Sequence, residues 1–145
     1  MSLSARRLLA SLLSFGVCLL LWVPASIAIA PSALGGNLPD ALVIDDADVL
    51  SRASRGELEA KLRSFEDQRV DARLITLRRL DYGISLNSFG EKLLETWSSP
   101  TGNPLLLMLI ETANKRSAVV ANQELEAQLP SSLLKSTART TMTVP

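Results

Sequence analysis

Three aspartates stand close together ahead of a predicted helix: Asp45, Asp46 and Asp48. Carboxylates supply the hard oxygen ligands that Ca²⁺ and Mg²⁺ take in proteins. They could also provide a nucleophile, or hold a metal-activated water, for hydrolysis of a phosphate ester. The spacing is not that of an EF-hand, because Leu50 falls where a ligand is needed and Ser51 where the turn glycine belongs. The structural alternative is that the helix dipole favours acidic residues here.

A second polar cluster comprises Arg78, Arg79, Asp81 and Tyr82. Guanidinium groups make paired hydrogen bonds to oxyanions, so the arginines could hold a phosphate or an acidic surface of a partner protein. Adjacent strand residues point to opposite faces, so one of the two arginines must face the core side or lie at the strand end. For Arg73, the exposed face of a strand is the simpler explanation. Asp-Tyr-Gly is ordinary turn chemistry, although turns after strands often carry function. We expect a partner-binding site at these four residues.

Hydrophobic periodicity predicts the elements that position these side chains. Two apolar runs, 72–77 and 105–110, have the length and composition of strands. Between them, residues 85–97 keep their apolar groups at helical spacing. This order predicts a β-α-β unit with a right-handed crossover. The second run does not alternate, which indicates burial on both faces of the sheet.

The flanking segments extend this unit. Residues 42–44 predict a short strand, followed by an amphipathic helix that Ser51 or Ser54 could cap and that ends near Gln68. Residues 117–121 predict an antiparallel return strand after a tight turn. A last helix could begin at Ser131 or Ser132 and include Leu133 and Leu134. The predicted fold is therefore α/β, with a mixed sheet of three or four strands in two or three layers.

The first 30 residues have the organisation of a secretory signal peptide. Arg6 and Arg7 precede an uncharged, Leu-rich segment, 8–23, and small residues follow it. An uncleaved membrane anchor is the alternative, and it would give the chain its membrane contact. Gly, Pro and Ser are abundant in 31–40, which predicts a linker ahead of a domain over 41–145.

The cleavage position stays open on sequence grounds. Ala28 and Ala30 have the A-x-A relation that signal peptidases read. Pro31 disfavours the bond after Ala30, so cleavage could instead follow Ala28 or Ala33.

Composition excludes several chemistries. The chain has no histidine, and its single cysteine, Cys18, lies in the expected signal peptide. The exported domain can therefore have no disulfide, no thiolate nucleophile, no Ser-His-Asp arrangement and no zinc site of the usual Cys/His type. A formal net charge of zero gives no reason to expect a nucleic-acid partner.

Three stretches of this sequence together resemble the TPM domain family. They are Val43-Ile-Asp-Asp-Ala-Asp-Val-Leu-Ser51, Leu77-Arg-Arg-Leu-Asp-Tyr-Gly83 and Leu94-Glu-Thr-Trp97. The resemblance spans about 42–145. Within the family, the chain is most similar to thylakoid-lumen proteins of cyanobacteria and plants that are linked to photosystem II repair and protection from photodamage.

The resemblance implies an exported accessory factor of the thylakoid lumen, or of the periplasm, that binds photosystem II subunits or assembly intermediates. It implies a second possibility, a weak metal-assisted acid phosphatase, an activity attributed to plant relatives. For that enzyme the candidate residues are Asp45, Asp46 and Asp48, and the candidate cofactor is Ca²⁺ or Mg²⁺. Family members usually continue past the position of Pro145 with a further helix, so we expect the domain to be incomplete at its carboxyl end.

Overall fold

The structure is a computed structural model that describes residues 28–128. Its centre is a four-stranded sheet in the order β1-β2-β3-β4. The first three strands are parallel, and the fourth runs antiparallel to the third. The strands are β1 (Val43–Asp45), β2 (Asp71–Leu77), β3 (Leu105–Glu111) and β4 (Arg116–Ala121); the helices are α2 (Arg52–Arg63), α3 (Leu86–Thr96) and α4 (Gln123–Glu126), with 3-10 turns η1 (Pro31–Leu34) and η2 (Glu66–Gln68). The predicted α/β fold with a mixed sheet is confirmed.

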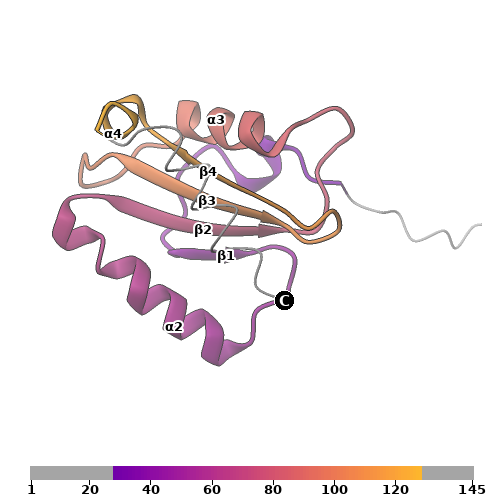
Figure 1. Cartoon of the computed structure of the whole chain (residues 1–145), viewed down its shortest axis with the longest axis horizontal. Coiled ribbons are helices and arrows are strands. Elements are labelled where there is room, and N and C mark those ends of the chain that lie inside the picture. Colours follow the sequence, from indigo (N-terminus) through magenta and orange to yellow (C-terminus); the bar gives the residue numbers. More distant parts are fainter. Residues whose placement is uncertain (1–27, 129–145) are drawn as a thin grey trace, which may run out of the picture.

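The elements form three layers, because helices cover both faces of the sheet (Figure 1). On one face, Leu107 and Leu109 of β3 pack in a cluster with Phe89 of α3. On the other face, Leu106 packs in a second cluster with Leu62 of α2. Burial on both sides is the physical reason that β3 does not alternate in sequence.

The two β-α-β units differ in hand. Both step in the same direction across the sheet, from β1 to β2 and from β2 to β3. Their helices, α2 and α3, lie on opposite faces. A parallel crossover that steps the same way over the opposite face has the opposite hand, so the usual right-handed rule holds for only one of these units.

Serine side chains begin both long helices. The Ser51 hydroxyl accepts from the backbone N–H of Ser54 (3.1 Å), which settles the two candidate caps of α2 in favour of Ser51. The Ser85 hydroxyl accepts from the N–H of Ser88 (3.0 Å) at the start of α3. The α2 helix ends at Arg63, before the predicted end near Gln68. The chain then passes through η2 and the left-handed Arg69 to enter β2.

Arg73 is buried, contrary to the expectation of an exposed strand face. Only 6% of the residue is exposed. Its Nε lies 2.6 Å from Oδ1 of Asp71, and its Nη1 donates to the carbonyl oxygens of Pro39, Asp40 and Ala41. The expectation was wrong because β2 is an inner strand with both faces covered.

The segment predicted as a linker packs against the domain. Leu34 and Leu38 contact the α3-side cluster, and the indole N–H of Trp97 donates to the carbonyl of Gly35 (3.1 Å). Ahead of it, Ile29 forms a parallel bridge with Leu80. The folded unit therefore begins before Ala41, and part of the Gly and Pro content of 31–40 serves η1 and the left-handed Gly35 (φ 88°).

Two expectations fall outside the described residues: most of the signal peptide, 1–27, and the helix expected from Ser131 or Ser132. Between residues 28 and 128, none of the helices combines the length and the hydrophobicity that a membrane span requires.

Candidate functional site

The carboxyl ends of the parallel strands meet at one edge of the sheet, and this carboxyl edge carries every predicted site residue. It comprises the strand ends and loops 45–50, 78–85 and 111–116. The loop after β1 leads to α2 on one face, and the loop after β2 leads to α3 on the other. The two adjacent loops therefore diverge to opposite faces of the sheet.

The Asp45 side chain has no exposed surface, and both of its carboxylate oxygens accept hydrogen bonds. The backbone N–H groups of Val49 and Leu50 donate to its two carboxylate oxygens (3.2 and 3.0 Å). The Thr76 hydroxyl and the Arg55 guanidinium (3.1 Å) also donate to it. Burial raises the pKa of Asp45, but these hydrogen bonds outweigh burial and hold the pKa below its usual 3.8. Asp45 is thus an ionised anchor that ties the loop after β1 and the start of α2 to β2.

Asp46 and Asp48 are exposed and separate from this anchor. The backbone N–H of Asp46 donates to the carbonyl of Thr76 (3.1 Å), and Asp48 adopts a left-handed conformation with φ of 53°. Within residues 28–128, no group of three acidic side chains is placed to hold a metal ion. Since Asp45 already accepts from four donors, the three aspartates do not fit a Ca²⁺ or Mg²⁺ site, and no metal-assisted step follows from them.

A second buried carboxylate, Glu111, stands at the end of β3 with no exposed surface. Its Oε1 accepts from the backbone N–H of Leu80 (3.0 Å) and from the Asn114 amide (2.9 Å). Its Oε2 accepts from Nε (2.8 Å) and Nη2 (2.6 Å) of Arg116. Burial raises the pKa of Glu111, and the donated hydrogen bonds together with the charge of Arg116 more than offset it, so the pKa lies below 4.5.

The predictions from sequence did not include Glu111, although the sequence holds a signal for it. Glu111 is the charged residue that ends the unbroken apolar run of β3. Arg116 faces it directly across the β3–β4 pair. A charge at the end of a buried strand, opposite the other sign across a predicted hairpin, indicates a buried ion pair.

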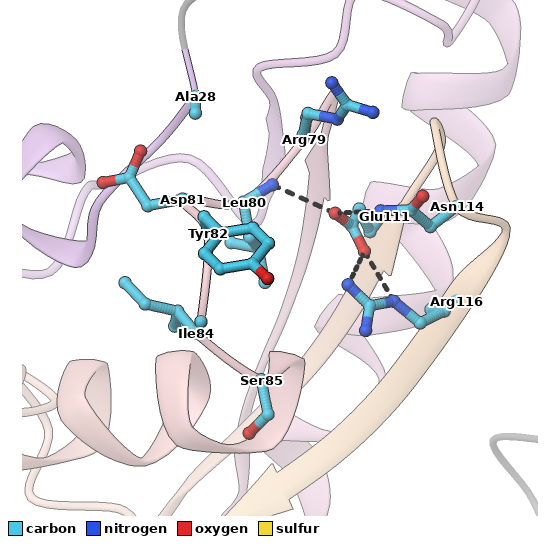
Figure 2. Close-up of a pocket in the computed structure, with 11 residues that line it drawn as sticks. Ala28, Arg79, Leu80, Asp81, Tyr82, Ile84, Ser85, Glu111, Asn114 and Arg116 are labelled. Atoms are coloured by element: carbon cyan, nitrogen blue, oxygen red, sulfur yellow. Dashed lines mark hydrogen bonds and ion pairs between the residues drawn. The ribbon is translucent and has the colours of Figure 1, made fainter.

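An open pocket of about 710 Å³ lies between the loop after β2 and the β3–β4 hairpin. The residues that matter for its chemistry are Ala28, Arg79, Asp81, Tyr82, Glu111 and Arg116. In Figure 2, Asn114 and Arg116 converge on the Glu111 carboxylate on one side of the Leu80–Tyr82 segment. The Asp81 carboxylate lies on the opposite side, where Ala28 approaches.

The four predicted partner-binding residues are brought together in one loop. Because β2 ends at Leu77, both Arg78 and Arg79 lie beyond the strand and are exposed. Neither guanidinium forms an ion pair or hydrogen bond with any residue of 28–128. Tyr82 is fully exposed, and Asp81 is half-buried.

Hydrogen bonds on both sides hold the backbone of this loop in place. The backbone N–H of Leu80 donates to Glu111, and Leu80 also pairs with Ile29 on the other side. The N–H of Ile84 donates to the carbonyl of Asp81 (3.2 Å), and Gly83 supplies the positive φ (85°) that this turn needs. The loop therefore presents a tyrosine and two arginines on a backbone that is already ordered.

The arrangement favours recognition over acid–base chemistry. The two buried carboxylates of the carboxyl edge, Asp45 and Glu111, are ionised and their oxygens are occupied by donors. A general base or nucleophile needs a free oxygen directed at its substrate. The exposed groups of the edge are Asp46 and Asp48, which do not converge on a common point, and Arg78, Arg79 and Tyr82, which are residue types that suit binding to a protein surface.

The fold and the sequence are similar to those of known proteins. The structure superposes on the solution structure of the N-terminal domain of a protein from P. gingivalis with a TM-score of 0.66 at 24% identity, over 81% of this chain and 78% of that one. This likeness shows the fold alone.

Two rice relatives extend the comparison to sequence. The chain is 28% identical over 107 residues to a chloroplastic UPF0603 protein of Oryza sativa subsp. indica and to its counterpart in subsp. japonica. The alignment covers 71% of this chain but only 36% of the length of each rice protein. The family model of the TPM domain matches residues 43–145, more than half of the sequence. The chain therefore belongs to the TPM domain family.

Proposed function

We propose that this protein is an exported accessory factor that binds photosystem II subunits or assembly intermediates and aids repair after photodamage. In this proposal it acts in the thylakoid lumen, or in the periplasm, and the loop 78–82 makes the contact. The observation that carries the proposal is one loop, fixed at Leu80, that exposes Tyr82 together with Arg78 and Arg79, two arginines without a side-chain partner within residues 28–128.

The composition of this surface supports a protein partner. Tyrosine and arginine are the residue types enriched at the energetic centres of interfaces. Val49 and Tyr82 are the large hydrophobic side chains exposed within residues 28–128, and both lie in loops of the carboxyl edge. Because the backbone of 78–82 is held on both sides, binding costs little ordering entropy. A partner that offers acidic groups around an apolar contact point would fit this surface.

Family membership supports the compartment. The rice relatives are chloroplastic proteins by name, and the amino-terminal 30 residues have the pattern of an export signal. The chain matches only 36% of the length of each rice protein. The role in photosystem II repair is therefore a proposal for this chain.

The phosphatase alternative gains no support from the geometry. It requires a free aspartate nucleophile or a bound metal among Asp45, Asp46 and Asp48. Asp45 accepts from four donors, and the three side chains do not converge.

The test is co-sedimentation of the exported full chain with photosystem II-enriched thylakoid membranes. We expect the double variant Arg79→Ala/Tyr82→Ala to bind at least about 30-fold more weakly, the loss typical of removing an interface hot spot. The matched control is Arg63→Ala, which removes an exposed arginine at the carboxyl end of α2. Equal binding by the double variant and the control, or no binding by the unmodified protein, would contradict the proposal.

A further inference from the structure

The structure assigns the bond between Ala28 and Ile29 as the site at which the exported chain is processed. We propose that a signal peptidase cuts here, and that the mature protein begins at Ile29. Sequence alone leaves three positions open, after Ala28, after Ala30 and after Ala33. The packing of Ile29 in the folded protein favours the first of these positions over the other two.

Ile29 belongs to the folded core. It is 7% exposed and lies in the α3-side cluster with Leu80 and Phe89. Its backbone N–H donates to the carbonyl of Arg79 (3.0 Å), and its own carbonyl accepts from the N–H of Asp81 (3.4 Å). Ile29 therefore acts as a one-residue edge strand beside the loop that follows β2.

The three possible cuts have different structural costs. Cleavage after Ala30 removes Ile29, its side-chain packing and both of these hydrogen bonds. Cleavage after Ala33 also removes most of η1, including Ser32, whose carbonyl accepts from the N–H of Gly35 (3.3 Å). Cleavage after Ala28 keeps every one of these contacts.

The residues around this bond suit a signal peptidase. Ser26 and Ala28 place small side chains at the two positions the enzyme reads, and Ile29 follows without the proline that hinders a cut after Ala30. Water hydrolyses the peptide bond, leaving a carboxylate on Ala28 and an α-ammonium group on Ile29. The buried position of Ile29 requires the cut to occur before the chain folds.

Cleavage after Ala28 would also change the pocket at the carboxyl edge. Ala28 lines that pocket (Figure 2), so cleavage removes a lining residue and leaves the new α-ammonium group of Ile29 next to the position that Ala28 occupied. The same nitrogen can still donate to the carbonyl of Arg79. This ammonium group would add a positive charge next to the 78–82 loop, because Ile29 exchanges backbone hydrogen bonds with Arg79 and Asp81.

The inference rests on export of the chain, which is part of the proposed function. The test expresses the full precursor in a bacterium that exports it, and determines the amino terminus of the purified product by mass spectrometry. We expect Ile29. The variant Ala30→Leu should also begin at Ile29, because it leaves the residues before the bond unchanged. The variant Ala28→Leu places a bulky side chain next to the bond, so we expect no product that begins at Ile29.

The outcomes separate the two proposals. A terminus at Pro31 or Leu34 would overturn the processing site while leaving export intact. A product that keeps residues 1–28 would overturn both the processing site and the expected signal peptide. As an independent check, Ile29→Ala in the exported protein should lower the melting temperature by roughly 10 °C, with Ser32→Ala as the control. An unchanged melting temperature for Ile29→Ala would remove the physical basis of the assignment.

Discussion

At the scale of single residues, the carboxyl edge holds two kinds of acidic side chain. Asp45 and Glu111 are buried, ionised and surrounded by donors, so they stabilise the loops that they join. Asp46 and Asp48 are exposed. This division separates residues that look equivalent in the sequence.

Substitutions of the neighbouring aspartates test the division. Asp45→Asn replaces an acceptor-only group with one that presents an NH₂ to donors, so we expect a loss of about 2 kcal/mol in the free energy of unfolding. Asp46→Asn should change it by less than about 0.5 kcal/mol, because the side chain is exposed. Urea denaturation of both variants measures the difference. Equal stabilities would show that Asp45 is no anchor.

The pH dependence of stability follows from the buried carboxylates. Asp45, Asp71 and Glu111 all have a folded-state pKa below the usual value, because hydrogen bonds and charges outweigh burial. An acid whose pKa is lowered on folding binds protons more readily when unfolded, so its contribution is complete above its unfolded pKa and is lost as the pH falls through the folded pKa.

We therefore expect the free energy of unfolding to be constant above about pH 5.5 and to fall as the pH is lowered from there. Denaturant titrations at a series of pH values measure this profile. Glu111→Gln, whose side chain cannot ionise, should be less stable at pH 7 by about 3 kcal/mol and should show a shallower acid slope. An acid slope as steep as that of the unmodified protein would contradict the assignment of Glu111.

At the scale of elements, the contact between α3 and the sheet depends on one glycine. A Cβ built on Gly90 would lie 2.5 Å from Cγ2 of Val120 and 2.6 Å from Cδ1 of Leu109. Both distances are far below van der Waals contact. Gly90 is therefore kept in the helix interior, where glycine is otherwise unfavourable, to let α3 approach β3 and β4.

Gly90→Ala should destabilise the protein by about 1 to 3 kcal/mol, because overpacking exceeds the gain in helix propensity. Gly56→Ala is the matched control, since a Cβ on Gly56 of α2 meets nothing within 4 Å. The control should stabilise by about 0.5 to 1 kcal/mol. Thermal denaturation of the two variants measures the effects. A stabilising effect at both positions would mean that α3 can move away from the sheet without cost.

At the scale of the whole molecule, residues 29–41 are part of the folded unit. Arg73 donates to three carbonyls of residues 39–41, Trp97 to the carbonyl of Gly35, and Ile29 extends the sheet edge beside Leu80. A free linker would make none of these contacts.

Hydrogen exchange followed by NMR tests this packing. We expect the indole N–H of Trp97 and the backbone N–H of Asp81 to be protected, because they donate to the backbone carbonyls of Gly35 and Ile29. The backbone N–H of Gly36, in the exposed turn, should exchange freely. Exchange of the Trp97 indole as fast as that of Gly36 would show that 31–41 is detached.

Much of the architecture could be predicted because it depends on local pattern. The apolar runs that became β2 and β3, the helix between them and its Ser85 cap all follow from side-chain spacing. Arg73 and residues 31–40 were misjudged, since their character depends on what covers them. The sequence does not distinguish an arginine of an inner strand from one of an edge strand. Only the fold shows that Arg73 donates to three backbone carbonyls of residues 39–41.

By itself, the sequence determined the α/β class, the order of strands and helices, the family and the gathering of polar residues after the parallel strands. These properties depend on periodicity and on short motifs that are contiguous in the chain. Only the tertiary structure decided which acids are anchors and which are free, that Glu111 pairs with Arg116 and holds Leu80, and that Ile29 belongs to the core. The reason is that burial and hydrogen bonding depend on groups distant in sequence. Asp45 and Thr76, or Ile29 and Leu80, become neighbours only when the sheet has formed.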